Sequence, residues 1–254
     1  MQDVRYDRSL LLSEPKRNAV LTLGEVARYG RDSFGDPDYV SLYGLRPAEW
    51  YDRGVRIRGR TAVECTRDRL GELIGRDVGR VVHLAPYGRA TVVDLFAGSA
   101  NTLFWIQRHF PSCRAVGFEL DRDVLRATRQ NISLLELDLE LHGVDYRTGL
   151  ASLTLEEDEL LVAFVAPPWG EALSSSGLDL GSTSPPVAEI VDALDASFPS
   201  PLLVAIQIYE QVDAASLSDV ERRFEWSMST AYAIDAPGTN HGLLLGSMRW
   251  TPEL

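Results

Sequence analysis

An acidic residue followed by a run of small residues is the first place in this chain where the residue types suggest chemistry. The segment reads Val93-Asp-Leu-Phe-Ala-Gly-Ser-Ala-Asn-Thr102 and predicts a strand, a tight turn and the start of a helix. Gly98, Ser99 and Ala100 would let a ligand approach the backbone, and the helix N-terminus would offer N–H groups to an anion. Asp94 would accept a hydrogen bond from an ammonium group. Alone, the motif is weak, because any α/β protein can turn tightly there.

A second acidic residue ends the next predicted strand, Arg114-Ala-Val-Gly-Phe-Glu119, and lies 25 residues after Asp94. A carboxylate at the tip of a second strand can accept hydrogen bonds from both ribose hydroxyls of a bound nucleoside. The alternatives are an exposed strand end for Glu119 and a helix N-cap for Asp121. We favour the ribose contact for Glu119 and the N-cap for Asp121.

A third motif, Ala166-Pro-Pro-Trp-Gly170, directly follows the apolar run Leu160–Val165. Two prolines end the hydrogen-bond ladder and hold the backbone rigidly, so that the carbonyl groups beyond the strand project outward. Trp169 then presents a flat face on which a planar molecule can stack. The alternative is a buried aromatic residue that covers the end of the sheet. We favour stacking because the motif follows an apolar strand in this context.

Short apolar runs alternate with helical stretches from Thr91 onward. The runs are 91–96, 114–119, 160–165 and 201–206, and the helical stretches include 121–137 and 186–194. This alternation predicts a doubly wound, mostly parallel α/β sheet, a Rossmann-like fold with helices on both faces. Segments 224–234 and 243–250, separated by turn residues that include Pro237-Gly238, predict a closing antiparallel pair. Ligands bind such sheets beyond the carboxyl ends of the strands, so the three motifs should lie close together.

Residues 1–55 are expected to form an N-terminal extension, partly irregular or helical, because turn signals recur in it. Residues 56–254 are expected to form the main domain. Within that domain, the apolar spacing in 61–73 predicts one amphipathic helix, and 144–147 is expected to be a short strand.

Together the three motifs resemble those of class I methyltransferases that use S-adenosylmethionine (SAM). Within that class, Pro-Pro-Trp-Gly170 and the Asn101-Thr102 pair resemble the trimethylguanosine synthase family, which methylates the exocyclic N2 of cap guanosine. The stretch from Asp94 to Ser99 is also similar to bacterial ribosomal-RNA guanine-N2 methyltransferases. The resemblance extends from about Arg56 to Ile206 and continues more loosely upstream, through Trp50–Ile57. It implies that SAM is the cofactor.

The resemblance, read with the residues themselves, predicts which side chains bind. The cofactor-binding candidates are Asp94, Phe96, Ala97, Gly98, Asn101, Thr102, Glu119, Leu120 and Thr148. The catalytic candidates are Ala166, Pro167, Pro168 and Trp169, and the substrate-binding candidates are Trp169, Trp50, Arg56 and His241. The chain departs from the family at Ala166, where relatives carry Asp, Asn or Ser, which leaves chiefly the carbonyl of Pro167 to accept from a target amine. It also has Thr148 where an acidic residue near adenine is usual.

The charge of the chain is unevenly distributed. The net charge is −12, yet residues 1–80 carry 15 Lys+Arg and 13 Asp+Glu, a net of +2, and the remainder carries 10 and 24, a net of −14. A net-acidic body repels nucleic-acid phosphates unless one face is basic. The best basic candidate is an arginine cluster interleaved with aromatic residues: Arg46, Arg53, Arg56, Arg58 and Arg60, with Trp50 and Tyr51. This cluster is equally typical of a solvated surface, so the charge favours a small-molecule partner over RNA.

Three functions stay open at this point. The first is methylation of a small planar or nucleobase-like acceptor, with N-methylation favoured, and the second is guanine-N2 methylation of RNA or of a cap. The third is a non-catalytic interaction module with the same fold. Methyl transfer from a sulfonium is an in-line displacement that needs no metal, and the four histidines show no metal-binding spacing. No metal is therefore expected.

Features that would direct the chain to a membrane or out of the cell are not expected. The longest apolar stretch, Leu160–Pro168, is far shorter than the roughly 20 residues that a membrane span needs. The segment Met1–Arg8 carries acidic residues where a signal peptide has a basic patch and an apolar run. Two cysteines are too few for a disulfide framework. We expect a cytoplasmic protein.

Overall fold

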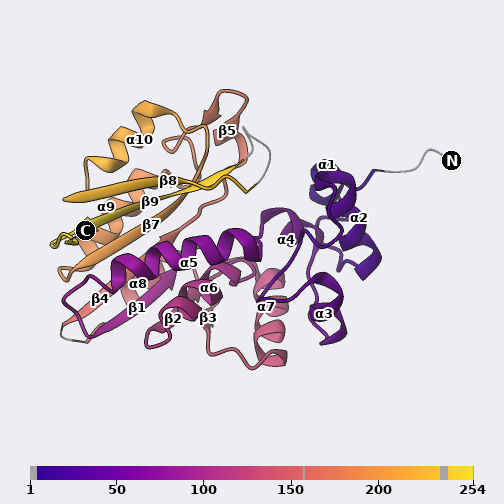
Figure 1. The fold of residues 1–254 in the computed structure, drawn as a ribbon, viewed down its shortest axis with the longest axis horizontal. Helices are drawn as coiled ribbons and strands as arrows, with labels where there is room; N and C mark the ends of the chain where they lie inside the picture. Colours follow the sequence, from indigo (N-terminus) through magenta and orange to yellow (C-terminus); the bar gives the residue numbers. More distant parts are fainter. Residues whose placement is uncertain (1–4, 157, 235–239, 254) are drawn as a thin grey trace.

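The computed structural model describes residues 5–156, 158–234 and 240–253, so Met1–Val4 and the predicted turn at Pro237-Gly238 lie outside the described residues. One seven-stranded sheet dominates the fold, in the order β3-β2-β1-β4-β7-β9-β8 (Figure 1). The strands are β1 (Arg89–Asp94), β2 (Arg114–Phe118), β3 (Glu140–His142), β4 (Glu159–Val165), β7 (Leu202–Tyr209), β8 (Trp226–Ala231) and β9 (His241–Met248). Strands β3, β2, β1, β4 and β7 are parallel, and β9 runs antiparallel to both β7 and β8. The predicted mostly parallel sheet and its closing antiparallel pair are therefore confirmed.

Burial of both faces explains the continuous apolar runs of the central strands. In β4 every residue is buried: Leu160, Val162 and Phe164 belong to one core cluster, while alternate residues such as Leu161 and Ala163 belong to the other. Successive side chains of a strand point to opposite faces, so each face needs its own covering layer. The strand reads as unbroken apolar sequence because neither face meets water.

Six helices form the two covering layers. Helices α5 (Asp68–Val82), α6 (Asn101–His109) and α7 (Arg122–Leu134) contribute to one core, and α8 (Tyr146–Ser152), α9 (Val187–Ser197) and α10 (Ala214–Glu221) to the other. Helices α5 and α6 pack closely because Gly71 and Gly75 of α5 face Trp105 of α6. A Cβ atom at Gly71 would lie 2.6 Å from the indole of Trp105, and one at Gly75 would lie 2.5 Å from its backbone carbonyl.

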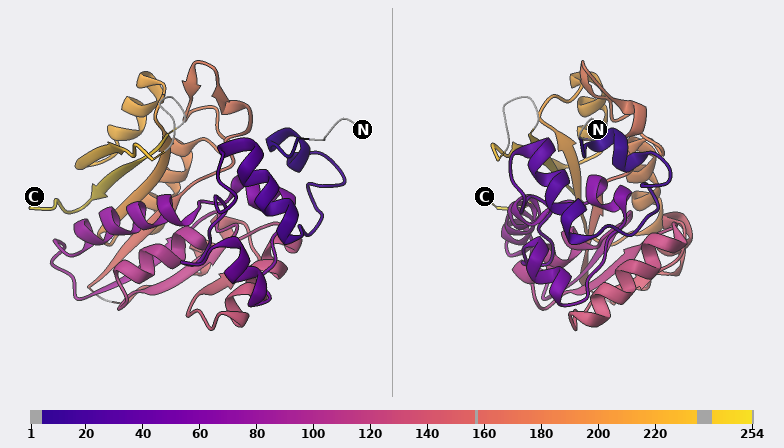
Figure 2. Two further views of the ribbon diagram at one scale, coloured as in Figure 1. Left: turned by 45° about the vertical axis from the view of Figure 1, so that its right-hand side comes forward. Right: turned by 90° about the vertical axis from the view of Figure 1, so that its right-hand side faces the viewer.

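The N-terminal part is helical and lies at one end of the sheet, on the side opposite the C-terminus (Figures 1 and 2). It comprises α1 (Arg8–Leu12), α2 (Leu23–Phe34), α3 (Pro47–Asp52) and α4 (Gly59–Glu64). Residues 57–60 pair with residues 17–21, through bonds such as Leu21 N to Ile57 O at 3.0 Å and Arg60 N to Arg17 O at 3.0 Å. The start of the predicted main domain is therefore part of the same packed unit as the extension.

Two local predictions are wrong. Residues 61–73 do not form one helix, because the chain breaks at Cys65–Arg67 between α4 and α5, where Thr66 uses its carbonyl to accept from Asn101 at 2.8 Å. The expected strand 144–147 is displaced to Glu140–His142, and α8 begins at Tyr146. The cause is a helix cap: the carboxylate of Asp145 accepts from the backbone N–H of Arg147 at 3.0 Å.

A buried polar network joins the extension to the turn that follows β1. The carboxylate of Asp68 accepts from the indole of Trp105 at 2.7 Å, from the amide of Asn101 at 3.1 Å and from Gly44 N at 3.0 Å. Asn101 also accepts from Tyr43 N at 2.7 Å, and the Tyr43 hydroxyl donates to Ser99 O at 2.5 Å. Burial raises the pKa of Asp68, and the bonds from Trp105 and its other donors oppose that rise. The network fixes the extension at the carboxyl end of β1.

Replacing Asp68 with Ala should lower the free energy of unfolding by about 3 kcal/mol, because it leaves several buried donors without an acceptor. Urea denaturation followed by circular dichroism measures the change. Asp38→Ala, which removes an exposed carboxylate from the extension, should leave the unfolding midpoint within error. A loss below about 1 kcal/mol for Asp68→Ala would contradict the role given to the network.

Candidate functional site

A cavity of about 1140 Å³ opens at the carboxyl ends of the parallel strands. Its lining includes the ends of β1, β2 and β4 on one side and residues of the extension on the other. The chain leaves β1 towards β2 and β3 and later returns to β4 on the opposite flank of β1, so the strand order reverses here. The volume exceeds the roughly 300–1,000 Å³ of typical small-molecule pockets, which leaves room for two ligands.

The turn after β1 brings a buried carboxyl group and a helix N-terminus to this cavity. Asp94 is 2% exposed, and one of its oxygens accepts from Phe96 N at 3.1 Å. Burial raises the pKa of Asp94 to about 7, and the charge of Glu119 adds to the rise. Gly98 has a φ of 51°, and Ala100, the N-cap of α6, has a φ of 57° and makes no side-chain cap. The first N–H groups of α6 are therefore not capped by the Ala100 side chain.

The predicted residues of this turn do not all reach the cavity. Phe96, Ala97, Gly98 and Thr102 line it. The side chain of Asn101 does not, because its oxygen and its nitrogen are both bonded within the network that holds the extension. The partners of Asn101 lie more than 30 positions away in the chain. The local sequence therefore could not predict that this side chain is bonded away from the cavity.

The carboxylate of Glu119 is held at the tip of β2 by two backbone N–H groups. It accepts from Gly98 N at 3.0 Å and from Asp121 N at 2.7 Å. Burial raises the pKa of Glu119, and these two hydrogen bonds oppose the rise. Each carboxylate oxygen has a second lone pair that can accept from a ligand. Leu120, also predicted, is 67% exposed and lines the cavity.

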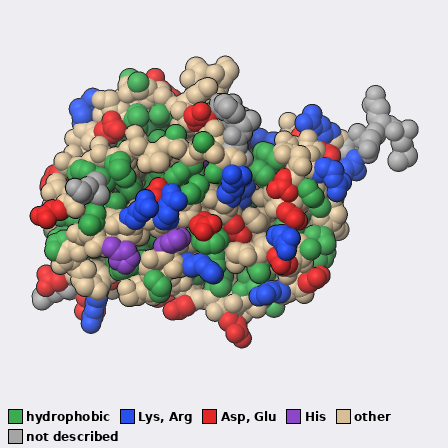
Figure 3. Space-filling model, viewed as in Figure 1, with side chains coloured by type: hydrophobic (Ala, Val, Ile, Leu, Met, Phe, Trp, Pro, Cys, Tyr) green, Lys and Arg blue, Asp and Glu red, His purple; other side chains and the backbone are tan. Residues whose placement is uncertain are grey.

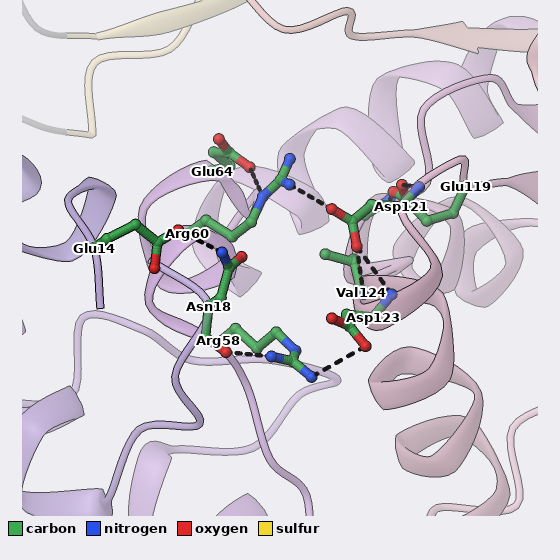
Figure 4. A network of polar contacts seen from close by, with 10 residues as sticks. Glu14, Asn18, Arg58, Arg60, Glu64, Glu119, Asp121, Asp123 and Val124 are labelled. Atoms are coloured by element: carbon green, nitrogen blue, oxygen red, sulfur yellow. Dashed lines mark hydrogen bonds and ion pairs between the residues drawn. The ribbon is translucent and has the colours of Figure 1, made fainter. Parts of the chain in front are cut away.

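The segment after Glu119 is bound to the extension by ion pairs (Figure 4). Asp121 caps α7, as predicted, by accepting from Asp123 N at 2.9 Å and from Val124 N at 3.1 Å. Its other oxygen meets the guanidinium of Arg60 at 2.7 Å, and Arg58 lies 3.6 Å from Asp123. The extension thus covers the junction between β2 and α7, and its arginines are directed at acidic residues of the main domain.

The predicted basic cluster is consequently dispersed. Arg46 lies 3.5 Å from Glu49, and Arg58 and Arg60 pair with α7 residues as described. On the face drawn in Figure 3, arginine and acidic side chains are interspersed among the described residues of the extension. Ion pairs with acidic side chains of the protein therefore account for the positions of Arg46, Arg58 and Arg60.

The structure places two predicted acceptor-binding residues, Trp50 and Arg56, away from the cavity. Trp50 is completely buried and donates its indole N–H to Val40 O at 3.1 Å. The guanidinium of Arg56 donates to Tyr51 O at 2.8 Å and lies 3.6 Å from the centre of the Tyr51 ring. Neither side chain lines the cavity. Both were candidates because aromatic and basic residues alternate there, a pattern that a folded core produces equally well.

The loop after β3 provides residues that the sequence reasoning missed. Thr148 is exposed on α8 and does not line the cavity, whereas Asp145 and Tyr146 do. The Tyr146 hydroxyl is buried without a hydrogen-bond partner among the described residues, and its ring lies 5.4 Å from that of Phe96. Correct placement of β3 would have identified Asp145 as the acidic residue after the strand.

The Pro-Pro-Trp segment forms an aromatic wall with residues from the far end of the chain. Trp169 stacks on His241, with 5.2 Å between ring centres and 23° between planes, and meets Tyr209 edge-on at 6.1 Å. The Gln207 amide lies 3.0 Å from Nδ1 of His241 and accepts from the Thr66 hydroxyl at 3.1 Å. All five residues line the cavity. Gln207 is a polar residue within the apolar run of β7, and this break in the pattern could have identified it as a site residue.

The remaining catalytic candidates lie at the tip of β4. Ala166 is half-buried and Pro167 is buried, and both line the cavity together with Pro168. Within 5–156, 158–234 and 240–253, the carbonyl oxygens of Ala166 and Pro167 accept no backbone hydrogen bond. They are therefore available to a donor on a bound molecule.

Two searches of the described residues were negative. No set of three or more His, Cys, Asp or Glu side chains in the described part of the chain is arranged to hold a metal ion. Among the helices within the described ranges, none combines the length and the apolar character that crossing a membrane requires.

Comparison with known proteins identifies the fold. No family model and no curated protein matches the sequence. Among solved structures, the METTL16 methyltransferase domain is similar with a TM-score of 0.52 and 12% identity, over 73% of this chain and 70% of that one. A precorrin-6Y C5,15-methyltransferase from Geobacter metallireducens GS-15 has a TM-score of 0.45 and 14% identity, over 74% and 90%. The putative methyltransferase yhhF from Escherichia coli has a TM-score of 0.42 and 15% identity, over 72% and 87%. The chain has the Rossmann-like class I methyltransferase fold.

Proposed function

We propose that the protein is a SAM-dependent methyltransferase that acts on a small planar or nucleobase-like acceptor, with nitrogen as the favoured methylated atom. One observation carries this proposal: Asp94, Glu119 and the Pro-Pro-Trp segment end three neighbouring parallel strands and line one cavity. The similarity in fold to the METTL16 methyltransferase domain, at 12% sequence identity, supports the methyltransferase class. The identity of the acceptor has to be inferred from the residues of the site.

The charges and hydrogen-bonding groups of the residues around β1 to β3 support SAM as the cofactor. The uncapped N-terminus of α6 would bind the carboxylate of the methionine part, and Asp94 would accept from its ammonium group. Glu119 would accept from the ribose hydroxyls through its remaining lone pairs. Asp145 and the partnerless hydroxyl of Tyr146 would bind polar groups of the nucleoside, with Asp145 in the position expected for adenine recognition.

The chain's own residues would bind and orient the acceptor. When bound, SAM supplies an electrophilic methyl group next to a good leaving group. Trp169, held against His241, would stack on a planar acceptor. The free carbonyls of Ala166 and Pro167 would accept from an N–H group and turn the nitrogen lone pair towards the methyl carbon. This arrangement supports N-methylation without the side chain that relatives carry at position 166.

The alternatives of the sequence analysis are less well supported. Guanine-N2 methylation of RNA relied on the arginine cluster, of which Arg46, Arg58 and Arg60 are paired with acidic residues. The kinship with trimethylguanosine synthases stays a prediction. A non-catalytic module would have no need for the carboxyl group of Asp94, which is 2% exposed and has a raised pKa. Burial of such a group destabilises the fold unless a ligand interacts with it.

Binding of SAM should weaken as the pH falls through 7. The pKa of Asp94 is about 7 in the empty site, and a cationic ligand favours the ionised form, so binding below pH 7 must expel a proton. We expect the dissociation constant from calorimetry to rise about tenfold between pH 8 and pH 6. Asp94→Asn should abolish the part of this dependence that Asp94 causes, and Asp138→Asn, which removes an exposed carboxylate, should preserve it. Equal pH profiles for wild type and Asp94→Asn would refute the role of Asp94.

Methyl transfer should be directed to small molecules. Incubation with methyl-labelled SAM and a fractionated cell extract should place the label in the low-molecular-weight fraction, with little in bulk RNA. Trp169→Ala should reduce turnover about tenfold or more, because stacking of one base on an aromatic side chain contributes roughly 1–3 kcal/mol. Label confined to RNA would contradict the small-molecule acceptor, and unchanged turnover in Trp169→Ala would contradict the stacking role.

The aromatic wall itself can be tested without an acceptor. A stacked imidazole quenches indole emission, so His241→Ala should increase tryptophan fluorescence in the wild-type background and leave it unchanged in Trp169→Phe. Gln207→Leu removes the partner of His241 Nδ1 and should change the emission in the same direction. An equal response to His241→Ala with and without Trp169 would show that the two rings are not stacked in solution.

A further inference from the structure

The residues that line the cavity form two groups of opposite formal charge, one from the first 67 residues and one from residue 94 onward. Among its described lining residues, those from 8 to 67 include Arg8, Arg17, Arg60 and Arg67 with one acid, Glu64, a formal balance of +3. Those from 94 onward include Asp94, Glu119, Asp121 and Asp145 with one arginine, Arg147, a formal balance of −3 when His241 is counted as neutral. A chain with a net charge of −12 therefore has four arginines from its first 67 residues in the lining of this cavity.

Two of these arginines form no hydrogen bond or ion pair through their guanidinium groups with the described residues. Arg60 is bound by Asp121 and Glu64, and Arg67 donates to the Tyr39 hydroxyl and lies over the Tyr39 ring. Arg8 and Arg17 are exposed, and within the described residues no hydrogen bond or ion pair involves either guanidinium. They can accept an anion without breaking an existing contact.

The extension also contributes aromatic residues to the cavity lining. Phe34 and Tyr39 stack with 3.5 Å between ring centres and 4° between planes, and both line the cavity together with Tyr29. Phe34 is 44% exposed, so part of its side chain is accessible to solvent. The lining contributed by the extension thus combines flat apolar surface with uncommitted positive charge, a combination that suits an organic anion.

We propose that Arg8 and Arg17 form an anion-binding subsite and that the methyl acceptor is a small planar molecule bearing a carboxylate or phosphate. The inference rests on the proposed methyltransferase function. The acidic group of lining residues binds the positively charged cofactor and repels an anion, so the acceptor is oriented with its negative group at the extension and its uncharged ring towards Trp169. The arginine side chains suit carboxylate and phosphate equally, because the guanidinium fork matches both.

The test measures binding of matched probes to the protein saturated with S-adenosylhomocysteine. The probes are naphthoate, naphthyl phosphate and the uncharged naphthamide. Calorimetry or ligand-observed NMR measures the affinity of each. We expect at least one anion to bind about tenfold more tightly than naphthamide, as a charge-assisted contact provides. Comparison of the two anions identifies which group the subsite prefers. The double variant Arg8→Gln/Arg17→Gln should abolish the preference.

Controls separate this inference from the function on which it rests. Arg46→Gln removes an exposed arginine of the extension that does not line the cavity, and the preference for anions should survive it. Failure of S-adenosylhomocysteine to bind would refute the methyltransferase function. Normal binding of that ligand with equal affinity for naphthoate, naphthyl phosphate and naphthamide would overturn the anion subsite alone. Tight, strongly salt-dependent binding of single-stranded RNA that is lost in the double variant would replace the small acceptor with nucleic acid.

Discussion

The hydrogen bonds between Asp68, Asn101 and Tyr43 are the constraint on which the cavity depends. They join the extension to the first turn of α6, where the chain has just left the central strand of the sheet. They help to fix the extension as the second wall at the carboxyl ends of the strands. Because every member is buried, each bond excludes water and leaves one arrangement of extension and sheet. The break between α4 and α5 places Thr66 and Asp68 next to Asn101.

The same break connects the two halves of the site. The backbone carbonyl of Thr66 accepts from Asn101 at the turn after β1, and its hydroxyl donates to Gln207, whose amide lies beside His241. The turn after β1 and the aromatic wall therefore share Thr66 as a common partner. Their spacing is set by this short polar chain rather than by two independent loops.

Burial of two carboxyl groups at the carboxyl edge of the sheet has an electrostatic cost. The raised pKa of Asp94, about 7, means that the folded protein resists ionising this group, so its contribution to stability falls as the pH rises from the ordinary Asp range towards 7. Glu119 is held at the same edge, and burial raises its pKa also. A cation bound close to both carboxyl groups would oppose both pKa rises, because it stabilises the ionised form.

The sequence by itself determined the sheet, its closing antiparallel pair and the strand-end positions of Asp94, Glu119 and Trp169, because apolar runs, prolines and helix caps act over a few residues. Only the tertiary structure decided that Trp50 is core and that Asn101 bonds to the extension, since these outcomes depend on partners distant in the chain. The pairing of arginines with α7 and the meeting of Gln207 with His241 were decided in the same way. Local patterns specify which residue ends a strand, whereas packing across the whole fold specifies what each long polar side chain contacts.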